Sequence, residues 1–139
     1  MWRKRRPKVI LDIEAGQTGL STRKLILESF GYNVLAAASG QEALLLSHKH
    51  EIHGVLLDES ANDVPLPELT AELKATLAIP IVLVGNSSYV PDDLKSTVDR
   101  AIVKLQDPQE TVNALDKALG ISDVPPATGK AIDVPRKNN

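Results

Sequence analysis

The chain contains no cysteine. Disulfide bonds, thiolate chemistry and cysteine-based zinc sites are therefore excluded, and a reducing compartment is permitted. No apolar run approaches the ~20 residues that a membrane-spanning helix needs. The basic start of the chain is followed by a short apolar strand rather than by a signal-peptide core. These absences predict a soluble, unexported, cytoplasmic protein.

An excess of one charge sign is also lacking. The 16 Lys and Arg residues nearly balance the 18 Asp and Glu residues, so the composition does not indicate a nucleic-acid-binding or membrane-surface protein. Residues 1–7 form a basic arm, which could contact phosphates or acidic lipid heads. A solvated leader is the simpler interpretation of such a short charge run. We expect no nucleic-acid contact beyond this arm and no membrane contact.

The rest of the chain alternates between strand and helix patterns. Apolar runs predict five strands, at residues 9–13, 33–37, 52–57, 80–84 and 101–103. Helical patterns follow each strand, although the one that begins near Pro91 is short and weak. Such alternation predicts an α/β fold with a parallel sheet covered by helices on both faces. Residues 8–120 therefore form one domain, and residues 121–139 are expected to be a disordered, proline-rich tail.

Capping signals mark the ends of the first two predicted helices. Thr18 or Ser21 is the expected N-cap of the first helix, and Gly31 ends it. Ser39 and Glu42 have the spacing of a capping box, which predicts the start of the second helix.

One carboxylate stands at the end of the third predicted strand. The apolar run Val55-Leu56-Leu57 leads directly to Asp58, where a polar loop begins. In an open parallel sheet, loops at the carboxyl ends of strands converge on a crevice where ligands bind. Asp58 is therefore the first candidate for a functional residue.

Residues 8–119 resemble the receiver domain of two-component response regulators. The resemblance rests on residues 55–58, which match the phospho-acceptor strand, and on residues 31–34, 39–44 and 80–82 together with Lys104. It implies a CheY-like, flavodoxin-like fold, a doubly wound five-stranded parallel sheet of order 2-1-3-4-5. It also implies that Asp58 is the phospho-acceptor and that Lys104 stabilises the phosphoryl group.

The resemblance is incomplete at the metal site. Receiver domains carry two adjacent acidic residues after the first strand, and these places fall on Glu14 and Ala15. Glu14, Asp58 and the carbonyl of Ser60 could still supply oxygen ligands to Mg²⁺, but with one carboxylate fewer. Asp12 lies on the same strand face as Glu14 and is expected to be too far down the strand to compensate. We expect weakened Mg²⁺ binding and no organic cofactor.

The conformational switch of the family is also degenerate. The hydroxyl residue that follows the fourth strand in receiver domains corresponds to Gly85, and the aromatic residue of the fifth strand corresponds to Ala101. The resemblance therefore implies an atypical member of the family, in which the acceptor is present and the residues that respond to it are mostly replaced.

Three functions remain open. The first is a stand-alone, atypical receiver domain in a phosphorelay, which receives its phosphoryl group from a histidine kinase or phosphotransfer protein. It would be no enzyme beyond self-phosphorylation or dephosphorylation of Asp58, and its last helix could form a homodimer. The second is a phosphorylation-independent pseudo-receiver that binds another signalling protein, with Asp58 and Lys104 as a structural ion pair. The third is a flavodoxin-like FMN or nucleotide binder that uses the Thr18-Gly19 loop to hold a phosphate.

Overall fold

The computed structural model describes residues 7–104 and 107–121. Its centre is a parallel sheet of five strands, whose order is β2-β1-β3-β4-β5. The strands are β1 (Val9–Ile13), β2 (Asn33–Ala37), β3 (Gly54–Asp58), β4 (Ile81–Gly85) and β5 (Arg100–Val103). This confirms the predicted flavodoxin-like sheet. The predicted basic arm up to residue 6 and the predicted tail from residue 122 lie outside the described residues.

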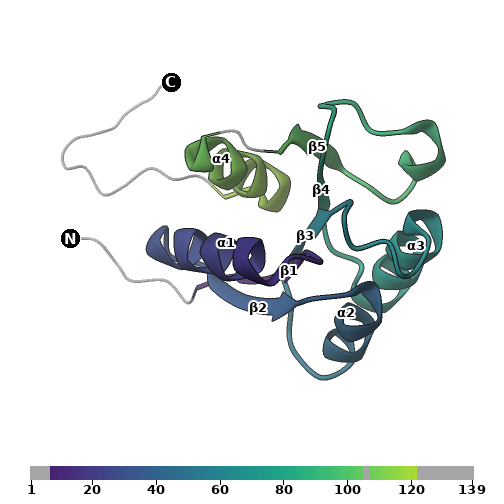
Figure 1. Ribbon diagram of the computed structural model, residues 1–139, viewed down its shortest axis with the longest axis horizontal. Helices are drawn as coiled ribbons and strands as arrows, with labels where there is room; N and C mark the ends of the chain where they lie inside the picture. The colour runs from purple at the N-terminus through teal and green to yellow at the C-terminus, as the bar shows by residue number, and fades with distance from the viewer. Residues whose placement is uncertain (1–6, 105–106, 122–139) are drawn as a thin grey trace.

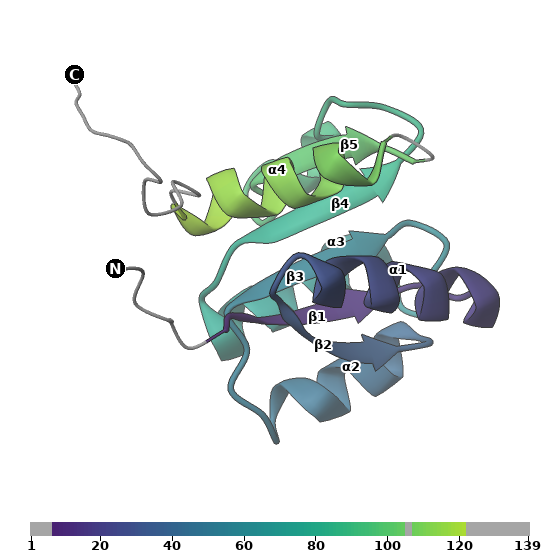
Figure 2. The ribbon, with the colours of Figure 1, turned by 90° about the vertical axis from the view of Figure 1, so that its left-hand side faces the viewer.

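Helices cover the sheet on both sides. Figures 1 and 2 show α1 (Gln17–Ser29) and α4 (Pro108–Leu119) on one face, and α2 (Gly40–Ser47) and α3 (Leu66–Leu77) on the other. Between β4 and β5, where the sequence indicates only a weak helix, the chain forms a single 3₁₀ turn, η1 (Asp92–Leu94). In the part of the chain that the structure describes, no helix is long and apolar enough to cross a bilayer.

The strands alternate their side chains between two separate apolar cores, as the pleat of a β-strand requires. The core on the α2/α3 face includes Leu11, Ile13, Val55, Leu57, Leu69 and Leu73. The core on the α1/α4 face includes Ile10, Leu27, Leu56, Val82 and Leu115. Both faces of the sheet are therefore covered by apolar side chains along most of its length, and polar groups meet at the carboxyl edge.

The helix ends agree only partly with the sequence prediction. Ser39 Oγ accepts a hydrogen bond from the Glu42 backbone N–H at 3.0 Å, which confirms the predicted cap of α2. The Glu42 carboxylate accepts from the N–H of Ala38 at 2.7 Å, one residue before the cap. Gly31 ends α1 with a φ of 99°, a conformation that glycine adopts without strain.

The predicted N-cap of α1 is wrong. The helix begins at Gln17 with Gly16 as its N-cap, and no side chain caps it. The Gly16 carbonyl already accepts the first helical hydrogen bond, from Leu20 N–H at 2.9 Å. Thr18 therefore lies inside the first turn, and its carbonyl accepts a hydrogen bond from the Thr22 hydroxyl. The helix starts earlier than predicted because an extended glycine can serve as an N-cap without a side chain.

Candidate functional site

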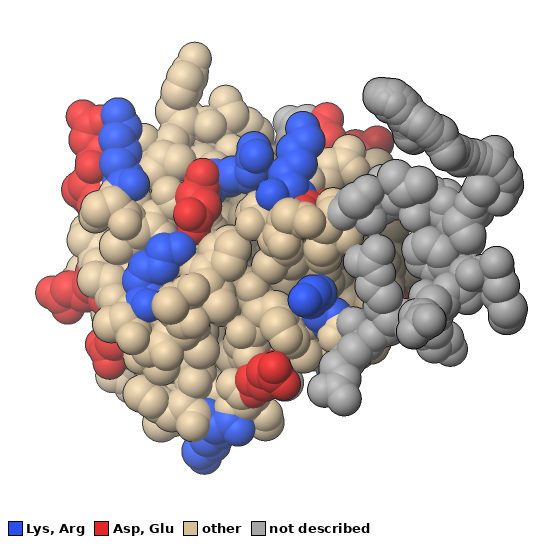
Figure 3. All heavy atoms as spheres, turned by 180° about the vertical axis from the view of Figure 1, so that it is seen from behind, with Lys and Arg blue, Asp and Glu red and all other residues tan. Residues whose placement is uncertain are grey.

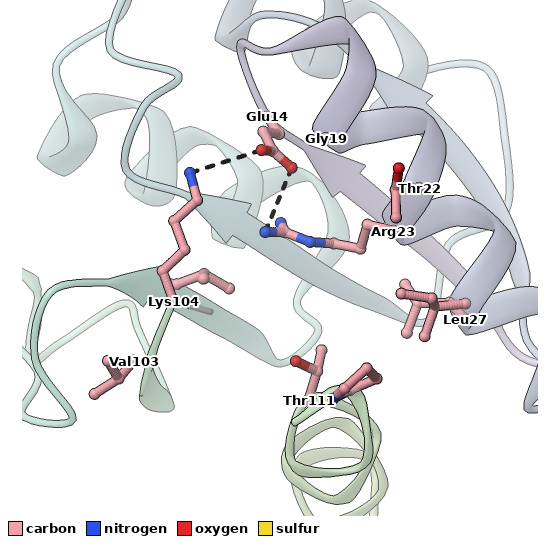
Figure 4. A pocket seen from close by; sticks show the side chains of 11 residues that line it. Glu14, Gly19, Thr22, Arg23, Leu27, Val103, Lys104 and Thr111 are labelled. Atoms are coloured by element: carbon pink, nitrogen blue, oxygen red, sulfur yellow. Dashed lines mark ion pairs between the residues drawn. The ribbon is translucent and has the colours of Figure 1, made fainter. Parts of the chain in front are cut away.

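The ends of three strands bring the predicted site residues together. Ile13 and Leu57 are partners in the β1–β3 register, so Glu14 and Asp58 follow on neighbouring strands. Lys104 follows β5 and extends its side chain toward Glu14 (Figure 4). Its Nζ lies 3.0 Å from Asp58 Oδ2 and 3.6 Å from Glu14 Oε2. A carboxylate pair and an ammonium thus face one another at the carboxyl edge of the sheet.

Asp58 is buried, and its carboxylate is held by several donors. Its exposure is 1%, and Oδ1 accepts hydrogen bonds from Ser60 N–H at 2.9 Å and from Lys104 Nζ at 3.3 Å. Burial works to raise the pKa of Asp58, but the hydrogen bonds from Ser60 and Lys104 outweigh it, so the pKa is below its usual value. Asp58 is consequently an ionised carboxylate at neutral pH.

Ser60 ties the loop after β3 to the end of β1. Its hydroxyl accepts a hydrogen bond from Ala15 N–H at 3.2 Å. Its carbonyl, one of the predicted metal ligands, accepts from Asn62 N–H at 3.0 Å. Ala15 therefore contributes its backbone to this loop, where the resemblance expects a second carboxylate.

Arg23 is the main residue of the site that the sequence analysis missed. It lies in the middle of α1, and its guanidinium points toward the Glu14 carboxylate (Figure 4). Nη2 lies 3.1 Å from Asp58 Oδ2 and 3.4 Å from Glu14 Oε1. Nη1 lies 3.3 Å from Asp12 Oδ1. A signal for this network was present, because a lone Asp inside an otherwise apolar buried strand needs a partner.

Asp12 is completely buried on β1. Burial raises its pKa to about 7, although the nearby Arg23 guanidinium acts in the opposite direction. Its Oδ2 atom has no hydrogen-bond partner, and neither has Glu14 Oε1. The acidic pocket formed by Asp12, Glu14 and Asp58 is therefore incompletely satisfied by its protein donors.

The arrangement is not preformed for Mg²⁺, because Arg23 and Lys104 are already paired with Glu14 and Asp58. Carboxylate oxygens are the ligands that this ion prefers, but it demands near-octahedral geometry. The described residues contain no group of three or more His, Cys, Asp or Glu side chains arranged to hold a metal ion. The space between the carboxylates is instead approached by Arg23 from one side and Lys104 from the other.

The predicted switch positions lie toward the other face of the sheet. Ala101 is half-buried and packs against the core of the α2/α3 face. Gly85 is buried, and the Glu59 carboxylate fills the volume that a side chain at position 85 would take. A flexible carboxylate therefore lies where receiver domains place a hydroxyl residue.

A cavity of about 280 Å³ adjoins the site between α1 and α4 (Figure 4). Glu14, Arg23 and Lys104 line its polar end. Apolar residues, which include Ile26, Leu27, Val84 and Val103, line much of the rest. The charged network thus borders open space on the side of α1 and α4.

The glycine-rich segment after β1 is not a loop. Thr18 and Gly19 lie in the first turns of α1, and the Glu14 carboxylate lies against Gly19 so closely that a Cβ there would clash with it. The prediction of a phosphate-binding loop at Thr18-Gly19 is therefore wrong, because the segment is helical and faces a carboxylate. The flavodoxin-like FMN or nucleotide alternative depended on this loop.

Comparisons with known proteins agree with this architecture. No protein-family model matches the sequence, and no curated protein matches it either. Many solved structures share its fold. A CheY-like response regulator receiver domain protein from Methanospirillum hungatei JF-1 has a TM-score of 0.73 and 23% identity, covering 83% of this chain and 95% of that one.

Two further structures carry information about their own active sites. The receiver domain of the sensor histidine kinase PA1611 from Pseudomonas aeruginosa PAO1, with magnesium coordinated in its active-site cleft, has a TM-score of 0.72 and 20% identity, covering 83% of this chain and 99% of that one. A response regulator protein from Burkholderia pseudomallei, with a phosphorylated aspartic acid, calcium and citrate, has a TM-score of 0.70 and 21% identity, covering 81% and 69%. Identities this low establish the fold alone: the chain has the CheY-like fold of response-regulator receiver domains.

Proposed function

We propose that this protein is a receiver-type module of phosphorelay signalling and that Asp58 is its phospho-acceptor. The observation that carries the proposal is the pairing of an ionised, nearly buried Asp58 with the Lys104 ammonium at 3.0 Å, at the carboxyl edge of the sheet. A carboxylate in this position can act as a nucleophile, and the ammonium beside it can stabilise negative charge on a transferring group.

The proposed step is a phosphoryl transfer. A carboxylate oxygen of Asp58 attacks phosphorus and forms an acyl phosphate, while the bond from phosphorus to the donor's leaving atom breaks and its electron pair stays with the donor. Lys104 then lies beside the new phosphoryl oxygens. Catalysis of such transfers depends mostly on positioning and on charge stabilisation, and Lys104 supplies one positive charge.

Mg²⁺ is the metal that this function would use, since the PA1611 receiver domain holds magnesium in its active-site cleft. The predicted ligands are Glu14, Asp58 and Ser60. We propose that they bind it weakly, because Ala15 supplies no carboxylate and because Glu14 and Asp58 are already paired with Arg23 and Lys104. No organic cofactor is part of the proposal.

The proposed partner is a histidine kinase or a phosphotransfer protein in the cytoplasm, and the module itself performs no turnover chemistry on a separate substrate. Basic and acidic side chains are interspersed over the described part of the face in Figure 3, which gives no broad surface of one sign for nucleic acid to bind. A homodimer through α4 stays a prediction.

A small phosphodonor tests the acceptor directly. Wild-type protein and the Asp58→Asn variant are incubated with acetyl phosphate over a range of Mg²⁺ concentrations, and the intact mass is measured. We expect one added phosphoryl group on the wild type, favoured by high Mg²⁺, and none on the variant. An unmodified wild-type protein at every Mg²⁺ concentration would remove the phospho-acceptor function.

A second function then takes its place: a pseudo-receiver that binds a signalling partner without phosphorylation. It is favoured by the occupation of both Asp58 oxygens, since Oδ1 accepts from Ser60 and Oδ2 lies within ion-pair distance of Arg23 and Lys104. Beryllofluoride, a phosphoryl mimic, separates the two functions. Changes in amide NMR shifts around Asp58 and Lys104 support the acceptor, and unchanged spectra support the pseudo-receiver.

A further inference from the structure

Three carboxylates share one pocket, and a single side chain contacts all of them. Asp12, Glu14 and Asp58 have exposures of 0%, 6% and 1%. Among the ion pairs of the described residues, Lys104 reaches Glu14 and Asp58, which lie on its side of the pocket. Arg23 reaches these two and also Asp12 beneath them.

Carboxylates buried this deeply need a compensating cation. Removing an ionised carboxylate from water costs far more than a neutral polar group does, unless the charge is paired. Lys104 supplies one positive charge for three potential negative ones. The guanidinium suits the second position because its planar fork presents several donors that can serve more than one carboxylate at once.

The positions of Arg23 and Asp12 in their elements indicate that they belong together. Arg23 lies three residues after Leu20 and four before Leu27, on the buried stripe of α1 that faces the sheet. Asp12 lies on a strand whose neighbouring residues are fully buried and apolar. Each would be costly at such a position alone, and together they form an ion pair between helix and sheet at 3.3 Å.

Some carboxylate oxygens of the acidic pocket nevertheless accept no hydrogen bond. Asp12 Oδ2 and Glu14 Oε1 are buried without a hydrogen-bond partner. The Arg23 contacts to Asp12 and Glu14, at 3.3 and 3.4 Å, are longer than the ~2.7–2.9 Å of strong charge-assisted hydrogen bonds. A small divalent cation binds carboxylate oxygens at about 2.0–2.6 Å and could use these two atoms, which accept no hydrogen bond.

The Arg23 side chain also borders open space. It is 15% exposed and lines the cavity of about 280 Å³ between α1 and α4. The hydroxyl residues Thr22 and Thr111 line the same cavity. A rotation of the Arg23 side chain into this space would leave the carboxylates open without moving the backbone of α1.

We propose that Arg23 is the built-in cation of the acidic pocket, that it takes the place of a divalent metal ion there, and that its removal uncovers a binding site for Mg²⁺ or Mn²⁺ on Asp12, Glu14 and Asp58. The two kinds of cation compete for the same oxygens. The competition is independent of whether Asp58 accepts a phosphoryl group.

Direct metal binding tests the proposal. Mn²⁺ is titrated into wild-type protein, Arg23→Met and the control Lys24→Met, and free Mn²⁺ is measured by electron paramagnetic resonance, with Mg²⁺ as competitor. Lys24 is adjacent in sequence and pairs only with Glu28 on the surface of α1 among the described residues, so its variant removes a charge without opening the pocket.

We expect Arg23→Met to bind Mn²⁺ about ten times more tightly than wild type, or more, and Lys24→Met to bind as wild type does. Mg²⁺ should displace the Mn²⁺, and adding Asp12→Asn should reduce the gain. Equal affinities of wild type and Arg23→Met, whether measurable or too weak to detect, would overturn the proposal. Acetyl phosphate is absent, so this result does not depend on the acceptor function.

A folding defect of Arg23→Met would not leave the question open. The double variant Asp12→Asn/Arg23→Met removes one charge of each sign and keeps Glu14 and Asp58 as ligands. It should also bind Mn²⁺ more tightly than the single variant Asp12→Asn, which retains the guanidinium. A folded double variant without this gain contradicts the proposal.

Discussion

The two faces of the sheet bury polar groups in different ways. On the α2/α3 face, the fully buried side chains that carry polar atoms include Ser47 and Thr70. Each hydroxyl donates a hydrogen bond to a backbone carbonyl of its own helix, at Leu44 and Leu66. Thr70 Oγ1 also lies 2.8 Å from the uncharged hydroxyl of Thr97. On the α1/α4 face, the buried polar groups are charged, and their partners come from different elements.

Because of this difference, the stability of each face rests on a different kind of interaction. A neutral hydroxyl that donates within its own helix stabilises by about 1 kcal/mol, and its removal leaves no buried charge. The acidic pocket joins α1, β1, β3 and the residue after β5 through ion pairs. Removing one member of such a network leaves the others buried and uncompensated, so the cost far exceeds that of one hydrogen bond. Stability on this face is therefore coupled to the candidate site.

The largest expected loss of stability comes from a substitution at the centre of the ion-pair network. Arg23→Met should lower the free energy of unfolding by about 3–5 kcal/mol, because three buried carboxylates lose their shared cation. Thr70→Val, on the α2/α3 face, should cost only about 1 kcal/mol. Urea unfolding at neutral pH measures both values.

The matched surface variant Lys24→Met should remain within about 0.5 kcal/mol of wild type. Equal stability losses for Arg23→Met and Thr70→Val would contradict the contrast between the two faces.

A smaller effect concerns pH. The pKa of Asp12 rises from 3.8 in the unfolded chain to about 7 in the folded protein, chiefly through burial. Asp12 therefore contributes stability that is complete below pH 3.8 and is lost as the pH rises through about 7. Between pH 5 and pH 8 this loss amounts to about 2–3 kcal/mol, at ~1.4 kcal/mol per pKa unit.

The variant Asp12→Asn isolates this contribution. Asn does not titrate, so the stability of the variant should fall less than that of wild type between pH 5 and pH 8, by about the same 2–3 kcal/mol. The groups that face Asp12, namely Arg23, Glu14 and Asp58, are present in both proteins. Parallel pH profiles would show that Asp12 is ionised throughout. As a control, the stability of Thr70→Val should depend on pH in the same way as that of wild type.

The fold was accessible from the sequence because its signals are local. Strand ends at Ile13 and Ala37, the Ser39 cap and the Gly31 terminator are each set by a few neighbouring residues, and the structure agrees with them. Asp58 was predicted as a site residue because it stands at the end of an apolar strand, and Lys104 because of the resemblance to receiver domains. The strand order places both at the same edge of the sheet, with only β4 between their strands.

The rest of the site depends on distances that sequence patterns do not encode. Arg23 and Asp58 are 35 positions apart, and the spacing from Leu20 and Leu27 places Arg23 on the face toward the sheet without showing which carboxylates its long side chain reaches. Asp12 was noted only as a distant candidate ligand, because its register with the helix above was unknown. The Glu59 side chain over Gly85 was missed for a similar reason: it depends on the neighbouring strand.

The smallest expected effect concerns that neighbouring strand, at the rim of the α2/α3 face. A methyl group at position 85 would collide with the Glu59 carboxylate, which is the far end of a flexible and partly exposed side chain. Glu59 can therefore turn into solvent, and Gly85→Ala should change the unfolding free energy by less than about 0.5 kcal/mol. The control Gly31→Ala should cost about 1 kcal/mol, since Gly31 has a φ of 99°. A loss of about 2 kcal/mol at position 85 would mean that Glu59 is held as firmly as the carboxylates beneath Arg23, and the contrast between one ionic face and one local face would no longer hold.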